Sequence, residues 1–196
     1  MTTSAKWSLL GVVVVLAVLI ALIPQLLSNP GDNGGTTAGE AGDGAGEASI
    51  SSVVADRPDC PADNAAGIEL PCLGGETGDG NDLATIVNVW AWWCEPCRTE
   101  LPVFDQFAAA HPELNVVGVH ADSNGSNGAA MLNDLGIELS SYQDDANLFA
   151  GTLGLPAVVP ITVVIDSSGE MVDMFPQTFD SVEDLEAAVG SVGELL

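Results

Sequence analysis

Residues 84–97 read Ala-Thr-Ile-Val-Asn-Val-Trp-Ala-Trp-Trp-Cys-Glu-Pro-Cys, an apolar run that ends in two cysteines. The β-favouring part of this run, residues 86–90, predicts a buried central strand. The next residues place Leu101, Phe104 and Phe107 at helical spacing, so we expect a helix that begins close to Cys94. Pro96 suits the first turn of such a helix, whereas Pro102 lies inside it and predicts a kink.

A cysteine at the start of a helix has a chemical use. Free N–H groups and the helix dipole favour negative charge there, which lowers the pKa of Cys94 and increases its thiolate fraction. The thiolate can attack a disulfide in another protein, and Cys97, one turn later, can then attack Cys94 and release that protein. The spacing therefore predicts a redox pair.

A Cys-x-x-Cys pair also occurs in zinc sites, which need a second pair of ligands. The remaining candidates do not show the spacing of a zinc knuckle: His111, His120, Cys60 and Cys72. We therefore expect no metal. His111, followed by a proline, is predicted to end the first helix, and His120 to end a strand.

Three separated segments carry a family resemblance. Residues 88–102, 116–122 and 159–169 are similar, in order, to the Asn-Phe-Trp-Ala-x-Trp-Cys-x-Pro-Cys-x-x-Glu-x-Pro signature, the next strand and the Pro-x-Thr-x-x-x-Asp-x-x-Gly segment of one group of proteins. From about Cys60 onward the chain thus resembles the thioredoxin superfamily, in its membrane-anchored TlpA/ResA-like branch. The resemblance implies an α/β sandwich, with a central mixed sheet flanked by helices, and a thiol-disulfide oxidoreductase that uses no cofactor.

The resemblance also implies a site for the client protein. The Val159–Pro160 peptide bond is expected to be cis and to face Cys94, with the Val159 backbone offered to an extended client segment. Pro156 is a competitor for this role, but Pro160 is preferred because Asp166 then falls at the family's spacing. The remaining candidate client contacts are Trp93, Glu95 and Pro96.

One position departs from thioredoxin. Thioredoxin has a buried aspartate six residues before its first cysteine, where this chain has Asn88. Glu100 matches a glutamate of the TlpA/ResA-like branch and is a candidate proton shuttle to Cys97, provided that burial raises its pKa. The alternative is a solvated helix glutamate. Glu95, between the cysteines, is expected to raise the pKa of the thiolate.

A second cysteine pair precedes the redox motif. An even number of cysteines in an oxidising compartment suggests disulfides, so we expect a structural bridge between Cys60 and Cys72. A second redox relay is the alternative, but neither cysteine follows a strand and begins a helix.

The chain divides into four parts by composition. Residues 1–6 are expected in the cytoplasm and 7–27, which lack charge, as a transmembrane anchor. Residues 28–52 are predicted to be a disordered, acidic, glycine-rich linker, and 53–196 the thioredoxin-like domain outside the cytoplasm. A cleaved signal peptide is the alternative to the anchor, although Ser28, Asn29 and Pro30 form a poor cleavage site.

The charge excludes some partners. The formal net charge is −25, and the only basic residues are Lys6, Arg57 and Arg98. Nucleic-acid binding and attachment to an anionic membrane surface both need clustered cations, so neither is expected. The acidity itself indicates solubility and self-repulsion.

These observations predict an exported, membrane-tethered oxidoreductase. By resemblance, its Cys-Glu-Pro-Cys motif and Glu100 imply a reductase of client disulfides such as those of apocytochrome c, with a membrane thiol-transfer protein as electron donor. The alternatives are an oxidant that introduces disulfides into exported proteins, and a copper- or haem-handling thiol protein. Further helices are predicted over 129–135, 144–153 and 181–189, with a hairpin over 161–175.

Overall fold

The computed structural model describes residues 54–191. The predicted anchor over 7–27 and the linker over 28–52 lie outside this range. Within it, every helix is too short or too polar to cross a bilayer.

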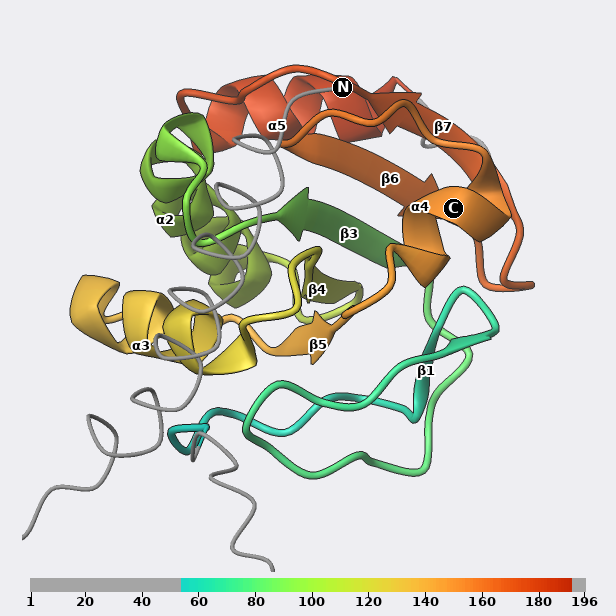
Figure 1. Ribbon diagram of the computed structural model, residues 1–196. Helices are drawn as coiled ribbons and strands as arrows, with labels where there is room; N and C mark the ends of the chain where they lie inside the picture. The colour runs from blue at the N-terminus through green and yellow to red at the C-terminus, as the bar shows by residue number, and fades with distance from the viewer. Residues whose placement is uncertain (1–53, 192–196) are drawn as a thin grey trace, which may run out of the picture. The chain divides into compact units, whose positions relative to one another are not determined.

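A five-stranded mixed sheet forms the centre of the domain, in the order β5-β4-β3-β6-β7 (Figure 1). The central strand β3 runs parallel to β4 and antiparallel to β6, so the pairing of the strands changes from parallel to antiparallel at β3. The outer strand β5 is parallel to β4, and β7 is antiparallel to β6. The bounds are β3 Thr85–Trp90, β4 Asn115–His120, β5 Ser141–Gln143, β6 Ile161–Ile165 and β7 Met171–Phe175.

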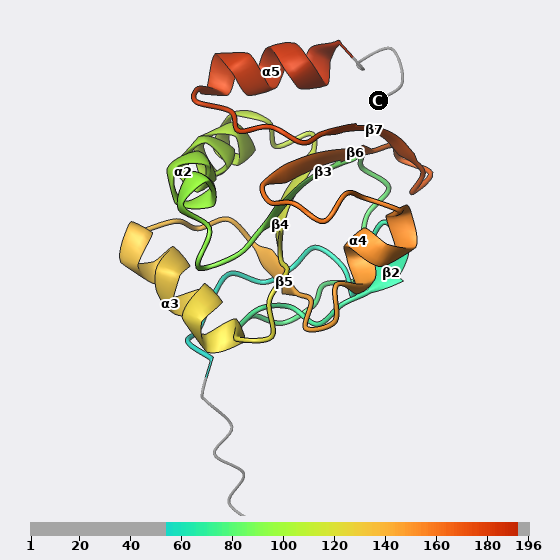
Figure 2. The same ribbon diagram turned by 45° about the horizontal axis from the view of Figure 1, so that its top comes forward.

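Helices cover both faces of the sheet (Figure 2). One face packs against α2 (Glu95–Ala110), α3 (Gly125–Leu135) and α5 (Val182–Gly190). The other packs against α4 (Leu148–Leu153) and a small hairpin of β1 (Asn64–Ala65) and β2 (Ile68–Glu69).

Burial on both faces explains the continuous apolar run of β3. Ile86 and Trp90 belong to the core under α2, while Val87 and Val89 belong to the core under α4. Since successive side chains of a strand point to opposite faces, each residue of β3 needs an apolar environment on its own side. The predicted central strand and the expected mixed-sheet sandwich are confirmed.

Helix starts differ from the predictions, for local reasons. The helix expected from residue 144 begins at Leu148, because the Asp144 carboxylate accepts the free N–H groups of its first two residues, Leu148 (2.8 Å) and Phe149 (2.9 Å). The helix expected from residue 129 begins at Gly125, because the Asn124 side chain caps it. Helix α2 includes Pro102 and continues to Ala110. His111 is its C-cap, so the predicted end of this helix is confirmed.

Gly118 of β4 is required by close packing. A Cβ atom there would lie 2.6 Å from Nε1 of Trp90 and would also collide with the Ser141 hydroxyl. Gly118→Ala is therefore expected to lower the free energy of unfolding by about 1–3 kcal/mol, as for other overpacked cores. Urea denaturation measures the change. The control is Gly190→Ala, where nothing lies within 4 Å of the added atom; equal losses in both variants would contradict this explanation.

Candidate active site

The two cysteines of the motif lie where β3 leads into α2. Cys94 is the N-cap of α2, and Cys94 and Cys97 are joined by a disulfide. The Cys97 backbone N–H points at Cys94 Sγ, with N···S 3.2 Å. That N–H is one of the helix donors without an intrahelical partner, so it stabilises negative charge on Cys94 once the disulfide is reduced. Cys94 is 4% exposed and Cys97 fully buried, so Cys94 is the sulfur closer to solvent.

The loop before β6 lies against this disulfide. The Val159–Pro160 bond is cis, as expected, and the Val159 carbonyl oxygen is 3.7 Å from Cys94 Sγ. Among residues 54–191, the Val159 N–H has no backbone acceptor. Pro160 is buried beside Ile161, whereas Pro156 is exposed in the preceding loop. Of the two prolines, Pro160 is thus the one whose cis peptide partner, Val159, lies against Cys94.

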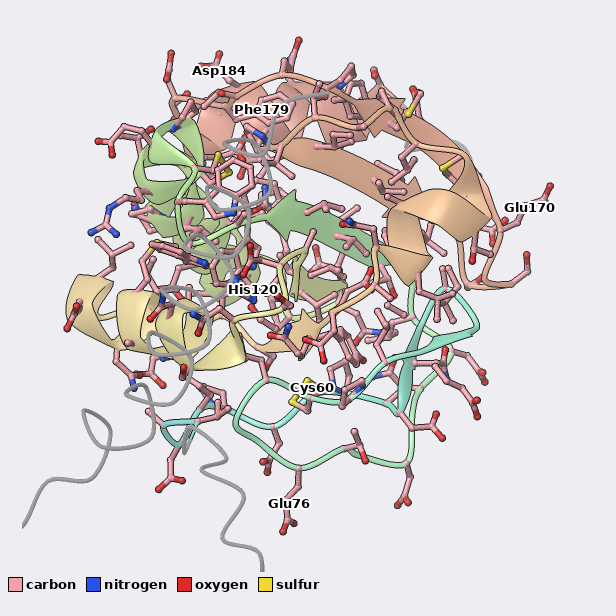
Figure 3. The ribbon with its side chains drawn as sticks, in the orientation of Figure 1. Cys60, Glu76, His120, Glu170, Phe179 and Asp184 are labelled. Carbon is pink, nitrogen blue, oxygen red and sulfur yellow. A yellow bond between two sulfur atoms is a disulfide. The ribbon has the colours of Figure 1, made fainter. Side chains whose placement is uncertain are left out.

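Glu100 is completely buried, one turn after Cys97 on α2. Its carboxylate accepts hydrogen bonds from the Phe179 N–H (2.8 Å) and the Asn88 side-chain amide (2.7 Å). Figure 3 shows Phe179 in the segment between β7 and α5. Desolvation raises the pKa of Glu100 to about 7; the two hydrogen bonds oppose this rise and the Asp180 charge adds to it. Glu100 is therefore a carboxyl that can exchange a proton near neutral pH.

Asn88 connects Glu100 to the sheet. It lies in β3 directly opposite Thr162 of β6, and both side chains are fully buried. The Asn88 Oδ1 atom has no hydrogen-bond partner among the described residues. The Asn88 side-chain amide thus donates its N–H to Glu100. At the position of Asn88, thioredoxin, by the resemblance above, has a carboxylate.

Asp122 is a site residue that the sequence did not identify. Its carboxylate accepts the indole N–H of Trp92 (3.1 Å), the indole N–H of Trp93 (3.0 Å) and the Asn124 N–H (2.8 Å). Partial burial raises the pKa of Asp122, but these hydrogen bonds outweigh it and the pKa is lowered overall. Asp122 therefore stays charged and fixes the two residues before Cys94. The only signal for Asp122 in the sequence was its position two residues after the predicted end of a strand at His120.

The other expected client contacts lie around the disulfide. Glu95 and Pro96 are exposed on the first turn of α2, and Trp93 is 59% exposed just before it. The exposed candidate contacts thus adjoin the disulfide in the chain: Trp93, Glu95 and Pro96. Val159 lies against Cys94 from the loop before β6, and Glu100 is buried.

Cys60 and Cys72 form a second disulfide, apart from the redox motif. It fixes the N-terminal segment along β5: the Leu73 N–H donates to Ser141 O (2.8 Å) and the Gln143 N–H to Pro71 O (2.8 Å). Figure 3 shows this sulfur pair beside the sheet edge. Covering an edge strand protects its unpaired backbone groups. Cys60 is almost completely buried, and neither cysteine begins a helix.

Removing this second disulfide is expected to affect stability more than chemistry. Closing a loop of 12 residues stabilises a protein by somewhat under 3 kcal/mol in the chain-entropy model. The double variant Cys60→Ala, Cys72→Ala should therefore lose about that much free energy of unfolding in urea titrations. It should keep the reduction potential of the Cys94–Cys97 pair. A shifted potential would instead support the redox-relay alternative.

The two histidines contact carboxylate or aromatic side chains of the domain. His111 contacts Glu113 (2.8 Å) and Glu186 (3.1 Å), and these carboxylates, Glu113 first, raise its pKa. His120 is buried against Trp90, with ring centroids 4.6 Å apart, and desolvation lowers its pKa. Figure 3 shows it near the middle of the domain. Residues 54–191 contain no group of three or more side chains placed to hold a metal ion.

The AhpC/TSA family model matches residues 61–174, which include α2, α3, α4 and all of the sheet except the last residue of β7. The chain belongs to the AhpC/TSA family. Within this thioredoxin-like family it is similar to thiol:disulfide interchange proteins. It is 36% identical over 100 residues to DsbE of Pseudomonas fluorescens biotype C, covering 50% of this chain and 53% of that one.

The chain is also similar to two further thiol-disulfide proteins. The chain is 36% identical over 76 residues to CycY of Rhizobium leguminosarum bv. viciae, covering 37% of this chain and 40% of that one. The crystal structure of a DsbF homologue from Corynebacterium diphtheriae superimposes with a TM-score of 0.53 and 27% identity, covering 62% of this chain and 81% of that one. The match spans about half the length of the DsbE relative.

Proposed function

We propose that this protein is an extracytoplasmic thiol-disulfide oxidoreductase that reduces client disulfides. The observation that carries the proposal is the Cys94–Cys97 pair at the start of α2, with the Cys97 N–H on Cys94 Sγ. The similarity to proteins named thiol:disulfide interchange proteins supports it.

The reaction proceeds by two exchanges. The Cys94 thiolate attacks one sulfur of the client disulfide; the S–S bond breaks, and the other client sulfur leaves as a thiolate. The Cys97 thiol then loses its proton and attacks Cys94, which releases the second client thiolate and leaves the Cys94–Cys97 disulfide. Two electrons thus pass from the protein to the client. A membrane thiol-transfer protein is the proposed donor that reduces the pair again.

Glu100 is the proposed proton acceptor for Cys97. Its buried carboxyl lies one turn from Cys97 and has a pKa of about 7, so near neutral pH it is ionised in part of the molecules. A proton can therefore move from the Cys97 thiol toward Glu100 as the mixed disulfide is resolved. Pro160 and the Val159 backbone are proposed to hold the client as an added extended strand.

Apocytochrome c during cytochrome c maturation is the proposed client, because the Cys-Glu-Pro-Cys motif and Glu100 resemble those of reductases of that branch. The proposed location is outside the cytoplasm, tethered by residues 7–27.

The reduction potential of the Cys94–Cys97 pair tests the direction of electron flow. Equilibration of the full chain with glutathione or dithiothreitol buffers, followed by thiol alkylation, measures it. A potential of about −270 mV or lower, like that of thioredoxin, supports a reductase. A potential of about −120 mV, like that of a strong oxidant, would overturn this direction and favour disulfide introduction into exported proteins.

A further inference from the structure

The disulfide between Cys60 and Cys72 borders an open pocket of the surface. The pocket has a volume of about 720 Å³, and its lining includes Cys72 but not Cys60. Cys72 is half-buried, whereas Cys60 is only 2% exposed. Of the two bridged residues, a solute in the pocket thus meets Cys72 first.

This asymmetry gives thiol-disulfide exchange a direction. A thiolate attacks one sulfur of a disulfide, and the other sulfur leaves. A thiolate in the pocket meets Cys72, so the new bond forms to Cys72 Sγ and Cys60 Sγ leaves. Cys60 Sγ lies 3.3 Å from the Ser141 carbonyl oxygen, which accepts the S–H of Cys60 once the leaving thiolate has taken a proton from water.

Carboxylates surround this pocket. Its lining contains no basic residue and three acidic ones, all exposed: Asp63, Glu69 and Glu76. Figure 3 shows Glu76 and Cys60 in the same part of the domain. Because opposite charges attract and like charges repel, a positively charged thiol is concentrated at this pocket and a negatively charged one is kept away.

The bridge restrains the segment that covers β5. The Leu73 N–H, next to the bridge, donates to Ser141 O (2.8 Å). The Gln143 N–H donates to Pro71 O, also at 2.8 Å. Opening the bridge removes a covalent restraint from this pairing, so these hydrogen bonds break more often and the sheet edge is less firmly covered.

We propose that Cys72 is a thiol-modification site, at which a small, positively charged thiol opens the Cys60–Cys72 disulfide and forms a mixed disulfide with Cys72. The S–S bond between the two cysteines breaks, its electron pair leaves on Cys60 Sγ, and one S–S bond forms between the thiol and Cys72. A second thiol that attacks the first completes the reduction and leaves as a disulfide with it. The site uses neither Cys94 nor Cys97, so it is independent of the function proposed above.

The test uses the full chain with Cys94→Ser and Cys97→Ser, in which Cys60–Cys72 is the only disulfide. The protein is treated with cysteamine, which is positively charged, or with glutathione, which is negatively charged, and new thiols are trapped with iodoacetamide. Mass spectrometry is expected to find cysteamine on Cys72 and the alkyl group on Cys60. Per ionised thiol, cysteamine is expected to react about ten-fold faster, the size of a few charge interactions near a surface. Peptide mapping of the wild-type chain gives the same comparison if the double variant does not fold.

Two further variants locate the charge preference. Glu69→Gln with Glu76→Gln removes two charges from the pocket and is expected to reduce the cysteamine-to-glutathione ratio several-fold. Glu170→Gln with Glu183→Gln is the matched control, because it changes the net charge equally at exposed positions outside the lining. Figure 3 shows Glu170 on a different side of the domain from Glu76. The control is expected to keep the ratio of the parent chain.

The outcomes distinguish this site from the redox pair. An adduct on Cys60 in place of Cys72, or no opening of the bridge by either thiol, would overturn the proposal. Equal rates for the two thiols, or a ratio that falls equally in both variants, would overturn the preference for a positive charge. Hydrogen exchange at the Leu73 and Gln143 amides is expected to be about ten-fold faster after opening, and unchanged exchange would contradict the restraint. None of these results bears on disulfide reduction by the wild-type chain, which insulin measures separately.

Discussion

Disulfide exchange is expected to fall to the uncatalysed background in Cys94→Ser. The Cys94 sulfur is the N-cap of α2 and faces both the Cys97 N–H (3.2 Å) and the Val159 carbonyl oxygen (3.7 Å), so it is the sulfur placed to meet a client. A serine hydroxyl stays protonated at neutral pH and does not form a mixed disulfide. The measurement is the reduction of insulin disulfides or of a client peptide, with dithiothreitol as electron source.

Cys97→Ser is the matched variant and has a different expected result. It keeps Cys94 as nucleophile but lacks the sulfur that resolves the mixed disulfide, so the client should remain covalently attached. Non-reducing electrophoresis with a cysteine-containing peptide detects this adduct. An adduct on Cys94→Ser, with none on Cys97→Ser, would mean that the two cysteines have the opposite roles.

The stability of the protein should fall as pH rises because of Glu100. Its folded-state pKa is about 7, above the ordinary 4.5, so between these values the folded chain holds a proton that the unfolded chain has lost. The loss of stability that comes from ionising the buried carboxyl is absent below about pH 4.5, grows between pH 4.5 and 7, and is complete above about pH 7. A shift of this size corresponds to about 3 kcal/mol. Urea denaturation of the oxidised full chain from pH 4 to 8.5 measures it.

Glu100→Gln is the control for this pH dependence. The glutamine amide does not titrate, and its oxygen can still accept the Phe179 N–H. Its NH₂ group can donate to Asn88 if that amide turns over, because Asn88 Oδ1 has no other partner among the described residues. The difference in unfolding free energy between wild type and variant should therefore change by about 3 kcal/mol across the pH range. A constant difference would contradict a raised pKa at Glu100.

The amino-acid sequence was sufficient to predict strands and helices where the pattern of residues is local. The apolar run of β3 and the cysteine spacing predicted a strand that leads into a helix, because burial on both faces demands such a run. The same reasoning failed for β5 and for the β1–β2 hairpin. These strands are two or three residues long, and β5 pairs with the disulfide-bridged segment far earlier in the chain. Strands this short have too few residues to show the alternation of apolar and polar side chains that predicts a strand.

For the site, the spacing in the sequence predicted the redox pair Cys94 and Cys97 at a helix start, and the family resemblance predicted Glu100 and Pro160. Only the tertiary structure decided their surroundings. The burial of Glu100 depends on Phe179 and Asn88, which are 79 and 12 residues away in the chain. The role of Asp122 depends on two tryptophans about 30 residues earlier. A pKa and a fixed indole are set by desolvation and by hydrogen bonds between distant segments, and no local pattern encodes those contacts.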